Sequence, residues 1–434
     1  MTHQRQEHIQ LPEDNWVHGK DVEYLTNMID TPFYVYNTES LLGAVDKARK
    51  VIGDNVPLYF SLKANPHPEV YNVLRKTGVR AEVSSAVELA TVLEQGVPGK
   101  DILFLGPGKK INDIAMCLEH KVRIVVESFQ EIDIVDSIAR DKNITADVLL
   151  RINPSFQTKA SGLRMGGAPR QFGIDEGILL EDRKLKERAS CVRVHGVHVY
   201  MGTRFLDAHS IIDNTYRILE LAQRVAKIQN FPLEFVDVGG GWGIPYFPNE
   251  EPLELETLRK GFQNIYDKFI SDNPNTTIAV ELGRFLVAHA GALVTRVLYT
   301  KESMGKKFAI LDGGTNIHMA AVGIGSFVRR DFPITTFRSQ EKEGEEDIWC
   351  LTGPLCTPND IVGKAVPLKE VQPGKVIIIA RSGAYGASAS PGLFLSHGFP
   401  SEVLIEQDGQ YKVSPGQSVL EILRQRHSIK HQII

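Results

Sequence analysis

Three short segments of this chain carry residue types that could do chemistry together. Lys63 lies inside an otherwise apolar run, where loss of solvent would lower the pKa of its ammonium group and leave an amine that can form a Schiff base with an aldehyde. The consecutive glycines 239–241 let backbone N–H groups approach a phosphate, because no Cβ stands in the way. Glu281 can keep a ring nitrogen protonated, and Arg284, three residues later, can bind a phosphate.

Each of these signals also has an ordinary structural explanation. A lysine at a strand end can extend to solvent, three glycines can form a tight turn, and Glu281 with Arg284 can be a surface ion pair. The glycine run lacks the spacing of a dinucleotide site, and residues 104–110 (FLGPGKK) lack the pattern of a nucleoside triphosphate loop. Taken together, however, a lysine, a phosphate loop and an acid match the aldehyde, the phosphate and the pyridine nitrogen of one cofactor, pyridoxal 5'-phosphate (PLP).

The elements that must position these residues follow an alternating pattern. Short β-branched apolar runs alternate with longer amphipathic segments, which is typical of a parallel sheet with crossover helices. The runs cover residues 58–64, 81–85, 101–105, 123–127, 147–153, 192–200, 234–238 and 277–282. They predict an α/β fold with a TIM-like (β/α)8 barrel, whose active site lies at the C-terminal ends of the strands. The lysine, the glycine run and the acid end the first, seventh and eighth runs.

The pattern changes after Arg284. Strand-like runs separated by turn clusters replace the helical periodicity, so we expect a second, mostly β domain. The predicted organisation has three parts: residues 1–36 as an N-terminal segment that packs with the β domain, residues 37–284 as the barrel, and residues 285–434 as the β domain.

Composition narrows the classes of protein that the chain could be. A formal net charge of -4 over 434 residues gives no basic footprint for nucleic acid, and no apolar stretch is long enough to span a membrane. The polar N-terminus does not resemble a signal peptide, so we expect a cytoplasmic protein. Four scattered cysteines without a CxxC pair favour free thiols over disulfides, and we expect no metal site.

Motifs spread over nearly the whole chain resemble the fold-type III PLP-dependent decarboxylases, which include diaminopimelate and ornithine decarboxylases. The motifs are Tyr59 to Asn65, Glu82 to Ser85 with Glu88, Gly239 to Gly241, Glu281 to Arg284, Gly353 to Cys356 and Ser382 to Gly386. The resemblance implies an alanine racemase/ornithine decarboxylase-like fold and a carbon–carbon lyase that removes the α-carboxyl group of an amino acid.

The resemblance also assigns roles to individual residues. Lys63 binds the cofactor covalently and Glu281 faces its pyridine nitrogen. The phosphate is held by Gly240, Gly241, Arg284 and Tyr385, with Thr203 in the place of a family serine. Glu82, His198, Tyr200 and Gly283 complete the expected cofactor site, and the expected substrate contacts are Arg284, Thr357, Asp360 and Tyr385.

Cys356 is the second catalytic residue that the resemblance implies. In such enzymes this cysteine reaches across a head-to-tail homodimer into the partner's site and supplies a proton. Most free cysteines in proteins are simply small buried apolar residues. Here the surrounding Gly-Pro-Leu-Cys sequence favours the catalytic role.

Two departures from the family pattern bear on the substrate. Tyr200 occupies the position of a histidine that stacks on the cofactor ring; it keeps a flat π face but not a titratable imidazole, and His198 either compensates or is structural. Thr357 follows Cys356 where diamine-forming members carry an acid that pairs with the distal ammonium of the substrate. Free diaminopimelate, ornithine and lysine are therefore disfavoured, unless Asp360 reaches the same place.

These departures, with residues 165–173 (MGGAPRQFG), resemble the subgroup that decarboxylates an L-glutamyl group on an acyl-carrier protein in butirosin biosynthesis. An acyl-carrier protein is then a possible partner. Candidate contacts to it or to a phosphate are Arg164, Arg170, Arg329 and Arg330, although solvated arginines are commoner. The alternatives are decarboxylation of free meso-diaminopimelate, an alanine-racemase-like activity, and a non-catalytic regulatory homologue.

Overall fold

The computed structural model describes residues 19–158, 165–181, 185–247, 249–322, 331–337, 346–420 and 422. The chain divides into two compact units. Residues 42–245 and 251–286 form one, here called the barrel unit, and the remaining residues belong to the other, here called the β unit. Each unit is described by itself.

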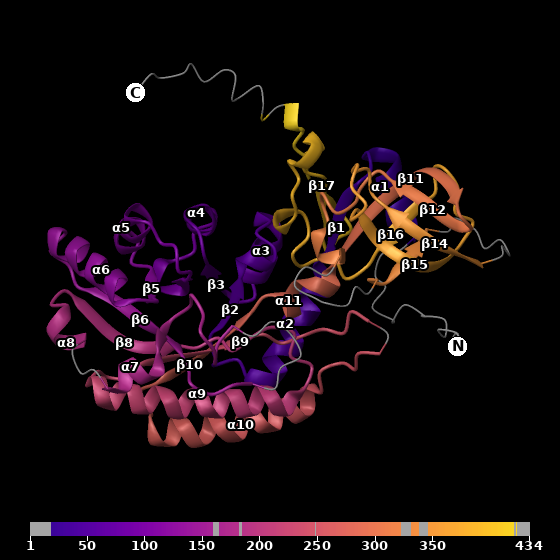
Figure 1. Ribbon diagram of the computed structural model, residues 1–434. Coiled ribbons are helices and arrows are strands. Elements are labelled where there is room, and N and C mark those ends of the chain that lie inside the picture. The colour runs from indigo at the N-terminus through magenta and orange to yellow at the C-terminus, as the bar shows by residue number, and fades with distance from the viewer. Residues whose placement is uncertain are drawn as a thin grey trace, which may run out of the picture. The chain divides into compact units, whose positions relative to one another are not determined.

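The barrel unit is a closed sheet of eight parallel strands (Figure 1). In chain order they are β2 (Leu58–Ser61), β3 (Arg80–Val83), β4 (Ile102–Phe104), β5 (Arg123–Val126), β6 (Ala146–Asn153), β8 (Val192–His198), β9 (Phe235–Gly240) and β10 (Thr277–Leu282). β10 pairs with β2 and so closes the ring, and the short β7 (Ile174–Asp175) adds to β6. The predicted (β/α)8 barrel is therefore confirmed.

The barrel is filled by apolar side chains from its strands. Tyr59, Leu103, Val125, Leu149 and Phe235 belong to one buried cluster that draws on β2, β4, β5, β6 and β9. Such layers make the barrel interior a packed core rather than a pore. Polar side chains that lie within these strands must therefore find partners near the strand ends.

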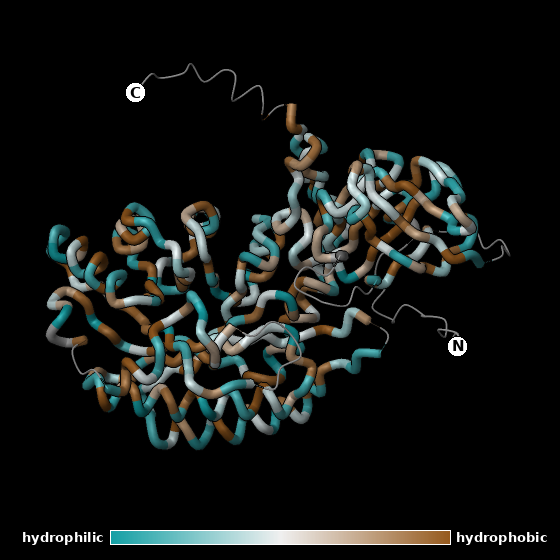
Figure 2. Tube along the Cα trace, viewed as in Figure 1, coloured by the Kyte–Doolittle hydropathy of each residue, from teal (hydrophilic) through white to brown (hydrophobic). Residues whose placement is uncertain are grey.

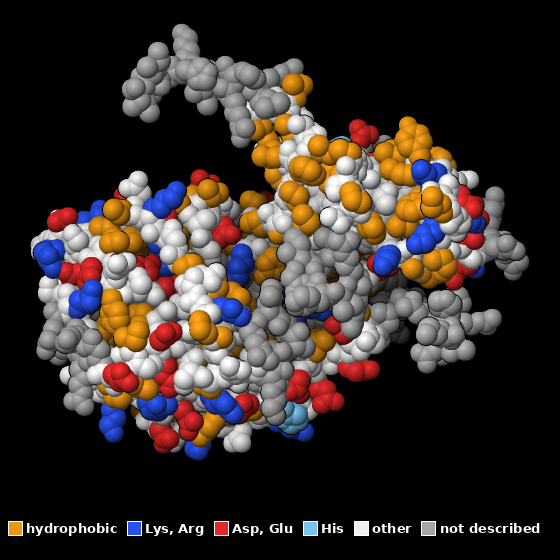
Figure 3. All heavy atoms as spheres, viewed as in Figure 1, with side chains coloured by type: hydrophobic (Ala, Val, Ile, Leu, Met, Phe, Trp, Pro, Cys, Tyr) orange, Lys and Arg blue, Asp and Glu red, His pale blue; other side chains and the backbone are white. Residues whose placement is uncertain are grey.

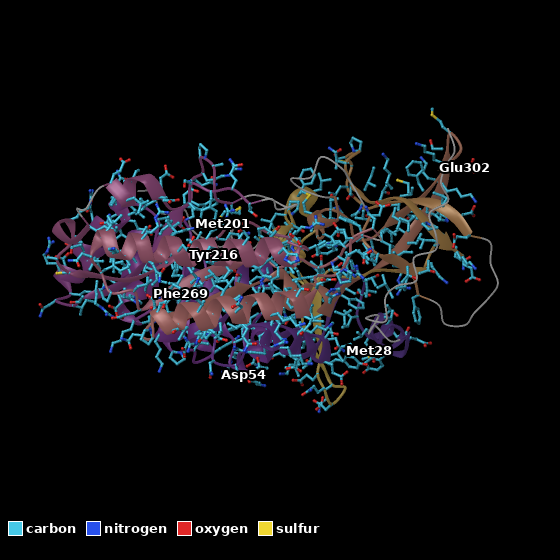
Figure 4. The ribbon with its side chains drawn as sticks, turned by 90° about the horizontal axis from the view of Figure 1, so that it is seen from below. Met28, Asp54, Met201, Tyr216, Phe269 and Glu302 are labelled. Atoms are coloured by element: carbon cyan, nitrogen blue, oxygen red, sulfur yellow. The ribbon has the colours of Figure 1, made fainter. Side chains whose placement is uncertain are left out.

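Helices follow the strands around the outside of the barrel. They are α3 (Pro68–Arg75), α4 (Ala86–Glu94), α5 (Ile111–Glu119), α6 (Phe129–Asp141), α7 (Glu176–Glu181), α8 (Leu185–Arg188), α9 (Ala208–Gln229) and α10 (Leu255–Asp272), and α2 (Thr38–Ile52) precedes the first strand. The long helices α9 and α10 lie side by side in both Figure 1 and Figure 4. Along them hydrophilic positions alternate with hydrophobic ones in Figure 2, as in helices with one buried face.

Two of these helices are started by the same reciprocal hydrogen bonds. Ser85 Oγ accepts from the amide of Glu88, and the Glu88 carboxylate accepts from the amide of Ser84. Ser128 and Glu131 repeat the arrangement at the start of α6. In each case the serine satisfies an N–H group of the first helical turn and the glutamate binds the amide just before the cap, which fixes the turns that leave β3 and β5.

The solvent-facing side of α9 and α10 carries charges of both signs. Arg217 pairs with Asp213 on α9, and Arg259 pairs with Glu256 on α10. On the face drawn in Figure 3, acidic and basic side chains are intermixed over the barrel unit. Among the described residues, no helix has the length and apolar character needed to cross a membrane.

The β unit contains a mixed sheet in the order β15-β14-β12-β11-β1-β17-β18, with β16 pairing with β11 and β13 pairing with β16. The strands are β1 (Phe33–Asn37), β11 (Gly291–Ser303), β12 (Lys306–Leu311), β13 (Ile334–Thr336), β14 (Glu346–Thr352), β15 (Ile361–Lys369), β16 (Val376–Ile379), β17 (Ser401–Ile405) and β18 (Tyr411–Ser414).

The amino-terminal part of the chain is built into this β unit. β1 pairs antiparallel with β11 and parallel with β17. Helix α1 (Gly19–Met28) contributes Val22 and Leu25 to the same buried cluster as Phe33 and Val403. The predicted mostly β domain is confirmed, and its mixed sheet includes β1, a strand that precedes the barrel in the sequence.

Candidate active site

Three buried ionisable side chains meet at the carboxyl ends of three neighbouring barrel strands. His198 ends β8, Asp237 lies in β9 and Glu281 lies in β10. A ring nitrogen of His198 and one carboxylate oxygen each of Asp237 and Glu281 lie within 4.8 Å of one another. Nε2 of His198 is 3.4 Å from Oε2 of Glu281. Since none of the three is more than 3% exposed, solvent contributes little to their charge balance.

The neighbours of these groups determine where the charge resides. Burial opposes the charged form of Glu281, but His198 and then Lys63 outweigh it and hold the pKa of Glu281 at about 2. Burial, reinforced by the negative charge of Glu281, raises the pKa of Asp237 well above its ordinary value. The arrangement therefore favours one ionised and one protonated carboxyl group side by side.

The glycine run at the end of β9 is shaped by a bulge. Asp237 pairs with Ala279 and Gly240 pairs with Glu281, so β9 has one extra residue between these pairs. A Cβ on Gly240 would lie 1.7 Å from the carbonyl oxygen of Glu281. Gly241 has a φ of +77°, and a Cβ there would lie 2.0 Å from the carbonyl oxygen of Gly202. Only glycine fits these positions.

The loop that follows β8 is bound to this glycine run. The amide of Phe205 donates to the carbonyl of Gly241, and the amide of Gly243 donates back to the carbonyl of Phe205. Thr203 lies in the same loop and is half-buried. The two predicted phosphate-binding segments are thus adjacent strand-end loops, held together by backbone hydrogen bonds.

Lys63 lies just beyond the end of β2. It is part of a short 3-10 turn, Leu62–Ala64, and its Nζ is 3.4 Å from Oε2 of the buried Glu82. The same Nζ lies 5.5 Å from the ring centroid of Tyr200. Tyr200, which replaces the family's stacking histidine, is therefore next to the lysine.

The sequence left two environments open for Lys63, a desolvated amine and a lysine that extends to solvent at a strand end. The Lys63 side chain is 42% exposed, whereas Leu62 and Ala64 on either side are buried. The physical reason is the turn, which begins directly after Ser61 and carries Lys63 past the strand end.

The end of β10 completes this edge of the barrel unit. A Cβ on Gly283 would lie 3.0 Å from the Cβ of Ala64, so the missing side chain lets β10 approach the lysine turn. Arg284 begins the short helix α11 (Arg284–Val287) and is half-buried. The barrel unit thus brings together ten of the predicted site residues at its strand ends: Lys63, Glu82, His198, Tyr200, Thr203, Gly240, Gly241, Glu281, Gly283 and Arg284.

Part of the segment 165–173 packs against the loop after β8. The amide of Met165 donates to the carbonyl of Met201, a residue labelled in Figure 4. A Cβ on Gly166 would lie 3.3 Å from the carbonyl oxygen of Tyr200. Arg170 is exposed, and Arg164, Arg329 and Arg330 lie outside the described residues.

Comparison with known proteins identifies the family of the chain. Residues 39–288 match the family model for the pyridoxal-dependent decarboxylases, pyridoxal binding domain. The chain belongs to this family. The predicted cofactor, PLP, and the predicted activity, decarboxylation of an amino acid, are therefore confirmed.

Relatives and solved structures of this decarboxylase cover most of its length. It is 34% identical to the L-glutamyl-[BtrI acyl-carrier protein] decarboxylase of Niallia circulans, over 91% of this chain and 92% of the relative. It is 29% identical to the diaminopimelate decarboxylase of Bacteroides thetaiotaomicron, over 87% and 97% of the two chains. The structure of diaminopimelate decarboxylase from Helicobacter pylori with L-lysine superposes with a TM-score of 0.83 at 27% identity, covering 93% and 99%.

The residues of the barrel unit fit PLP. Oε1 of Glu281 is buried and receives no hydrogen bond from the residues described, so it can accept from a protonated ring nitrogen. Without Cβ atoms the glycine run packs closely against β10 and the loop after β8, and Gly240 and Gly241 are only half-buried, which suits a backbone phosphate site at the strand ends. Bound there, PLP supplies the electron sink that accepts the electron pair released as carbon dioxide leaves.

Four predicted site residues belong to the β unit. Cys356 is exposed and Thr357 is half-buried. Tyr385 has a φ of +56°, a conformation that a bulky residue adopts only when its surroundings impose it and that is concentrated at functional sites. Asp360, the fourth, is 2% exposed.

The carboxylate of Asp360 accepts three hydrogen bonds, one from its own loop and two from the segment after β12. Oδ1 accepts hydrogen bonds from the amide and the hydroxyl of Thr315 at 2.7 and 2.8 Å, and Oδ2 accepts one from the amide of Leu355 at 2.7 Å. Gly314 and Gly353 leave room for it, since a Cβ on either would lie 2.5 Å or less from a carboxylate oxygen. This geometry fixes the backbone on both sides of Cys356.

Sequence reasoning missed one member of the site, Asp237. The signal was present, because Asp237 is an acid inside the apolar run 234–238, directly before the glycines. A charged residue in a buried strand requires a partner, and that requirement could have drawn attention to it.

Proposed function

We propose that this decarboxylase removes the α-carboxyl group of an L-amino acid whose side-chain carboxyl is masked, specifically an L-glutamyl group attached to an acyl-carrier protein. The observation that carries the proposal is the neutral Thr357 next to Cys356. Diamine-forming members of the family have an acid at this place. Without it, a buried distal ammonium would lose its partner, which costs about 2–5 kcal/mol.

The surroundings of Asp360 support the same proposal. Asp360 is the acid that could have replaced the missing one, but its two oxygens accept three hydrogen bonds from Thr315 and Leu355. Releasing it to meet a substrate ammonium would leave those donors unsatisfied in a buried place. A substrate without a distal ammonium makes no such demand.

The identity to the Niallia circulans enzyme, whose name specifies a glutamyl group on an acyl-carrier protein, adds independent support. A thioester-linked glutamyl group has no free distal carboxylate and no distal ammonium. Its side-chain end is neutral, as Thr357 is. Packing of Met165 and Gly166 beside Tyr200 and Met201 would then border the entrance for the long carrier arm.

Each predicted residue of the cofactor site would have a defined task in this reaction. Lys63 would bind PLP through its side-chain amine. Glu281 would keep the ring nitrogen protonated, and Thr203, Gly240, Gly241, Arg284 and Tyr385 would bind the phosphate. Tyr200 would provide a flat aromatic face for the ring. Glu82 keeps the ammonium of Lys63 oriented, since the two groups are 3.4 Å apart.

The proton that replaces the carboxyl group comes, in this proposal, from Cys356 of a second copy of the chain in a homodimer. Cys356 is exposed within the β unit, so its thiol is accessible to another molecule. A thiol can act as a general acid when it is held within reach of the reacting carbon. The loop held by Asp360 provides that fixed position.

The test is carbon dioxide release from the PLP-loaded protein. Purified enzyme is incubated in parallel with glutamyl-carrier protein, free L-glutamate and free meso-diaminopimelate, and the masses of the products are measured by mass spectrometry. Release from the carrier-bound substrate alone is the expected result. Turnover of free diaminopimelate with the carrier-bound substrate untouched would overturn the proposal.

Decarboxylation of free meso-diaminopimelate is the second candidate. It is favoured by the superposition on the Helicobacter pylori diaminopimelate decarboxylase with L-lysine. The same assay decides between the two candidates, because the two substrates differ at the distal end that Thr357 would face.

A further inference from the structure

Asp237 contacts two parts of the PLP site at once. Its Oδ1 accepts a 2.8 Å hydrogen bond from the amide of Gly239, the first residue of the glycine run. One oxygen of its carboxyl group also lies within 4.8 Å of an oxygen of the Glu281 carboxyl group on the neighbouring strand. The side chain is completely buried, so every one of its polar atoms must be satisfied by the protein.

Two buried carboxyl groups within 4.8 Å of each other are stabilised when they share one proton. Oδ2 of Asp237 and Oε1 of Glu281 are both buried, and no N–H or O–H group of the described residues donates to either. If both groups were ionised, two negative charges would face each other without solvent, which is strongly unfavourable. One shared proton removes the repulsion and satisfies both oxygens.

The surrounding charges indicate which of the two carboxyl groups holds the proton. His198 and Lys63 both stabilise the ionised form of Glu281. No cation is among the main causes that shift the pKa of Asp237. Burial, Glu281 and Glu82 all raise this pKa and so favour the neutral form, whereas the hydrogen bond from the amide of Gly239 lowers it. Two other ionisable groups lie near Asp237. A ring nitrogen of His198, on the adjacent strand β8, is within 4.8 Å of an Asp237 oxygen, and Tyr59 is an uncharged phenol whose own pKa burial raises.

We propose that Asp237 is a positioning residue that stays protonated, donates a hydrogen bond to the ionised Glu281, and with its other oxygen holds the first glycine of the phosphate loop. The proposal concerns the cofactor site and does not depend on which amino acid the enzyme uses.

Asp237 would therefore connect Glu281, which faces the ring nitrogen, to the glycine run, which faces the phosphate. An ionised carboxylate has about four acceptor positions, so Glu281 can accept from Asp237 and still accept from the protonated ring nitrogen. The bulge in β9 lets the same residue reach Gly239. Through Asp237, the orientation of Glu281 and the shape of the phosphate loop depend on each other.

The first test compares D237N with D237A. Asparagine imitates a protonated aspartic acid: its oxygen can accept from Gly239 and its NH2 group can donate to Glu281. We expect D237N to bind PLP within about threefold of wild type and to keep its absorption spectrum. D237A loses both hydrogen bonds, and we expect its dissociation constant for PLP to rise about tenfold or more.

The second test detects the proton directly and does not use activity. The infrared difference spectrum of wild type minus D237N at pH 7 should contain the C=O stretch of a protonated carboxylic acid, and the band should shift when aspartate is labelled with carbon-13. The control is D136N, because Asp136 is also buried but forms an ion pair with Arg140. Its difference spectrum should contain a carboxylate band instead.

A third measurement uses the sign of the pH dependence. A buried aspartic acid with a raised pKa makes the folded state lose stability as pH rises above the unfolded pKa of about 3.9. For the full-length chain without PLP, the unfolding constant of wild type relative to D237N should therefore increase by up to tenfold per pH unit above about pH 4.

The proposal is overturned if the infrared spectrum of wild type minus D237N contains a carboxylate band, because Asp237 would then be ionised. It is also overturned if D237N loses PLP as strongly as D237A, since the neutral isostere should replace a neutral acid. A wild-type stability that rises with pH relative to D237N would overturn it as well.

Discussion

The Nζ atom of Lys63 lies 3.4 Å from Oε2 of Glu82, whose side chain is completely buried. The pair joins an exposed cation on the turn after β2 to a fixed anion in β3. A long flexible lysine is thereby held at the strand ends, near Tyr200, where the cofactor's aldehyde is expected. Lys63 is thus restrained without being removed from solvent.

Lys63 should carry PLP covalently. Borohydride reduction followed by peptide mass spectrometry should find the pyridoxyl group on the peptide that contains Lys63, and K63A should carry no label and release no carbon dioxide. K100A is the control, because Lys100 is exposed in the turn before β4, at the other end of the strands. Label that persists on K63A would contradict the assignment.

Replacement of Gly241 should abolish the phosphate site. G241A places a Cβ 2.0 Å from the carbonyl oxygen of Gly202, at a φ of +77° that alanine rarely adopts, so the loop must move. We expect the dissociation constant for PLP, measured by absorbance, to rise about tenfold or more. G108A, in another strand-end loop with open space around its Cα, should stay within about twofold of wild type.

The β unit should lose stability on acidification because of His318. Burial lowers the pKa of His318 to about 4, while Tyr34 and Ser382 hydrogen bond to its ring nitrogens. The neutral ring therefore contributes stability that is fully present above the unfolded pKa of about 6.5 and lost as pH falls towards 4, roughly 3 kcal/mol in all.

Urea unfolding between pH 7 and pH 4 checks this prediction. The free-energy difference between wild type and H318Q should shrink as pH falls, because the variant lacks the titrating ring. H397Q, which alters an exposed histidine, should keep the wild-type pH dependence. Parallel curves for wild type and H318Q would show that His318 does not titrate in this window.

An acid at position 357 should move substrate preference towards diamino acids. T357E supplies the negative charge that the family uses for a distal ammonium, so we expect its kcat/KM for meso-diaminopimelate to exceed that of T357Q by about tenfold or more. T357Q has nearly the same size without the charge. Equal values for the two variants would mean that position 357 does not face the distal end of the substrate.

Asp360 should control the loop that bears Cys356. D360N replaces an acceptor-only carboxylate that takes three hydrogen bonds, so we expect about 2–3 kcal/mol of lost stability and faster alkylation of Cys356 by iodoacetamide. T315V removes only the hydroxyl bond and should have a smaller effect on both. An unchanged alkylation rate in D360N would show that the loop does not need this carboxylate.

The barrel could be predicted from the sequence because its strands are short, buried and rich in β-branched residues. The predicted run 147–153 corresponds to β6 (Ala146–Asn153), and the run 277–282 corresponds to β10 within the same bounds. Strand β15 is harder to recognise in the sequence because Gly363 and Pro367 interrupt its pattern. Proline is tolerated there since β15 ends the sheet order, where an N–H group is not required on one side.

The candidate site was predicted less completely for a different reason. Lys63, Glu281 and the glycines are recognisable from residue type and position along the barrel strands. The engagement of Asp360 and the role of Asp237 depend on neighbours that are distant in sequence, namely Thr315 and Glu281. Such contacts follow from strand register and loop packing, which local patterns do not encode.

Strand β1 has a consequence for synthesis on the ribosome. Phe33 emerges early, but its partners in the sheet are Val294 and Ser401. The barrel strands are all complete by Leu282, so the barrel unit can fold while the chain is still being made. The β1 segment, with its apolar Phe33 and Val35, must wait until nearly the whole chain has been translated. During that interval it is an apolar strand without an edge to join, and a chaperone that covered it would protect the nascent protein from aggregation.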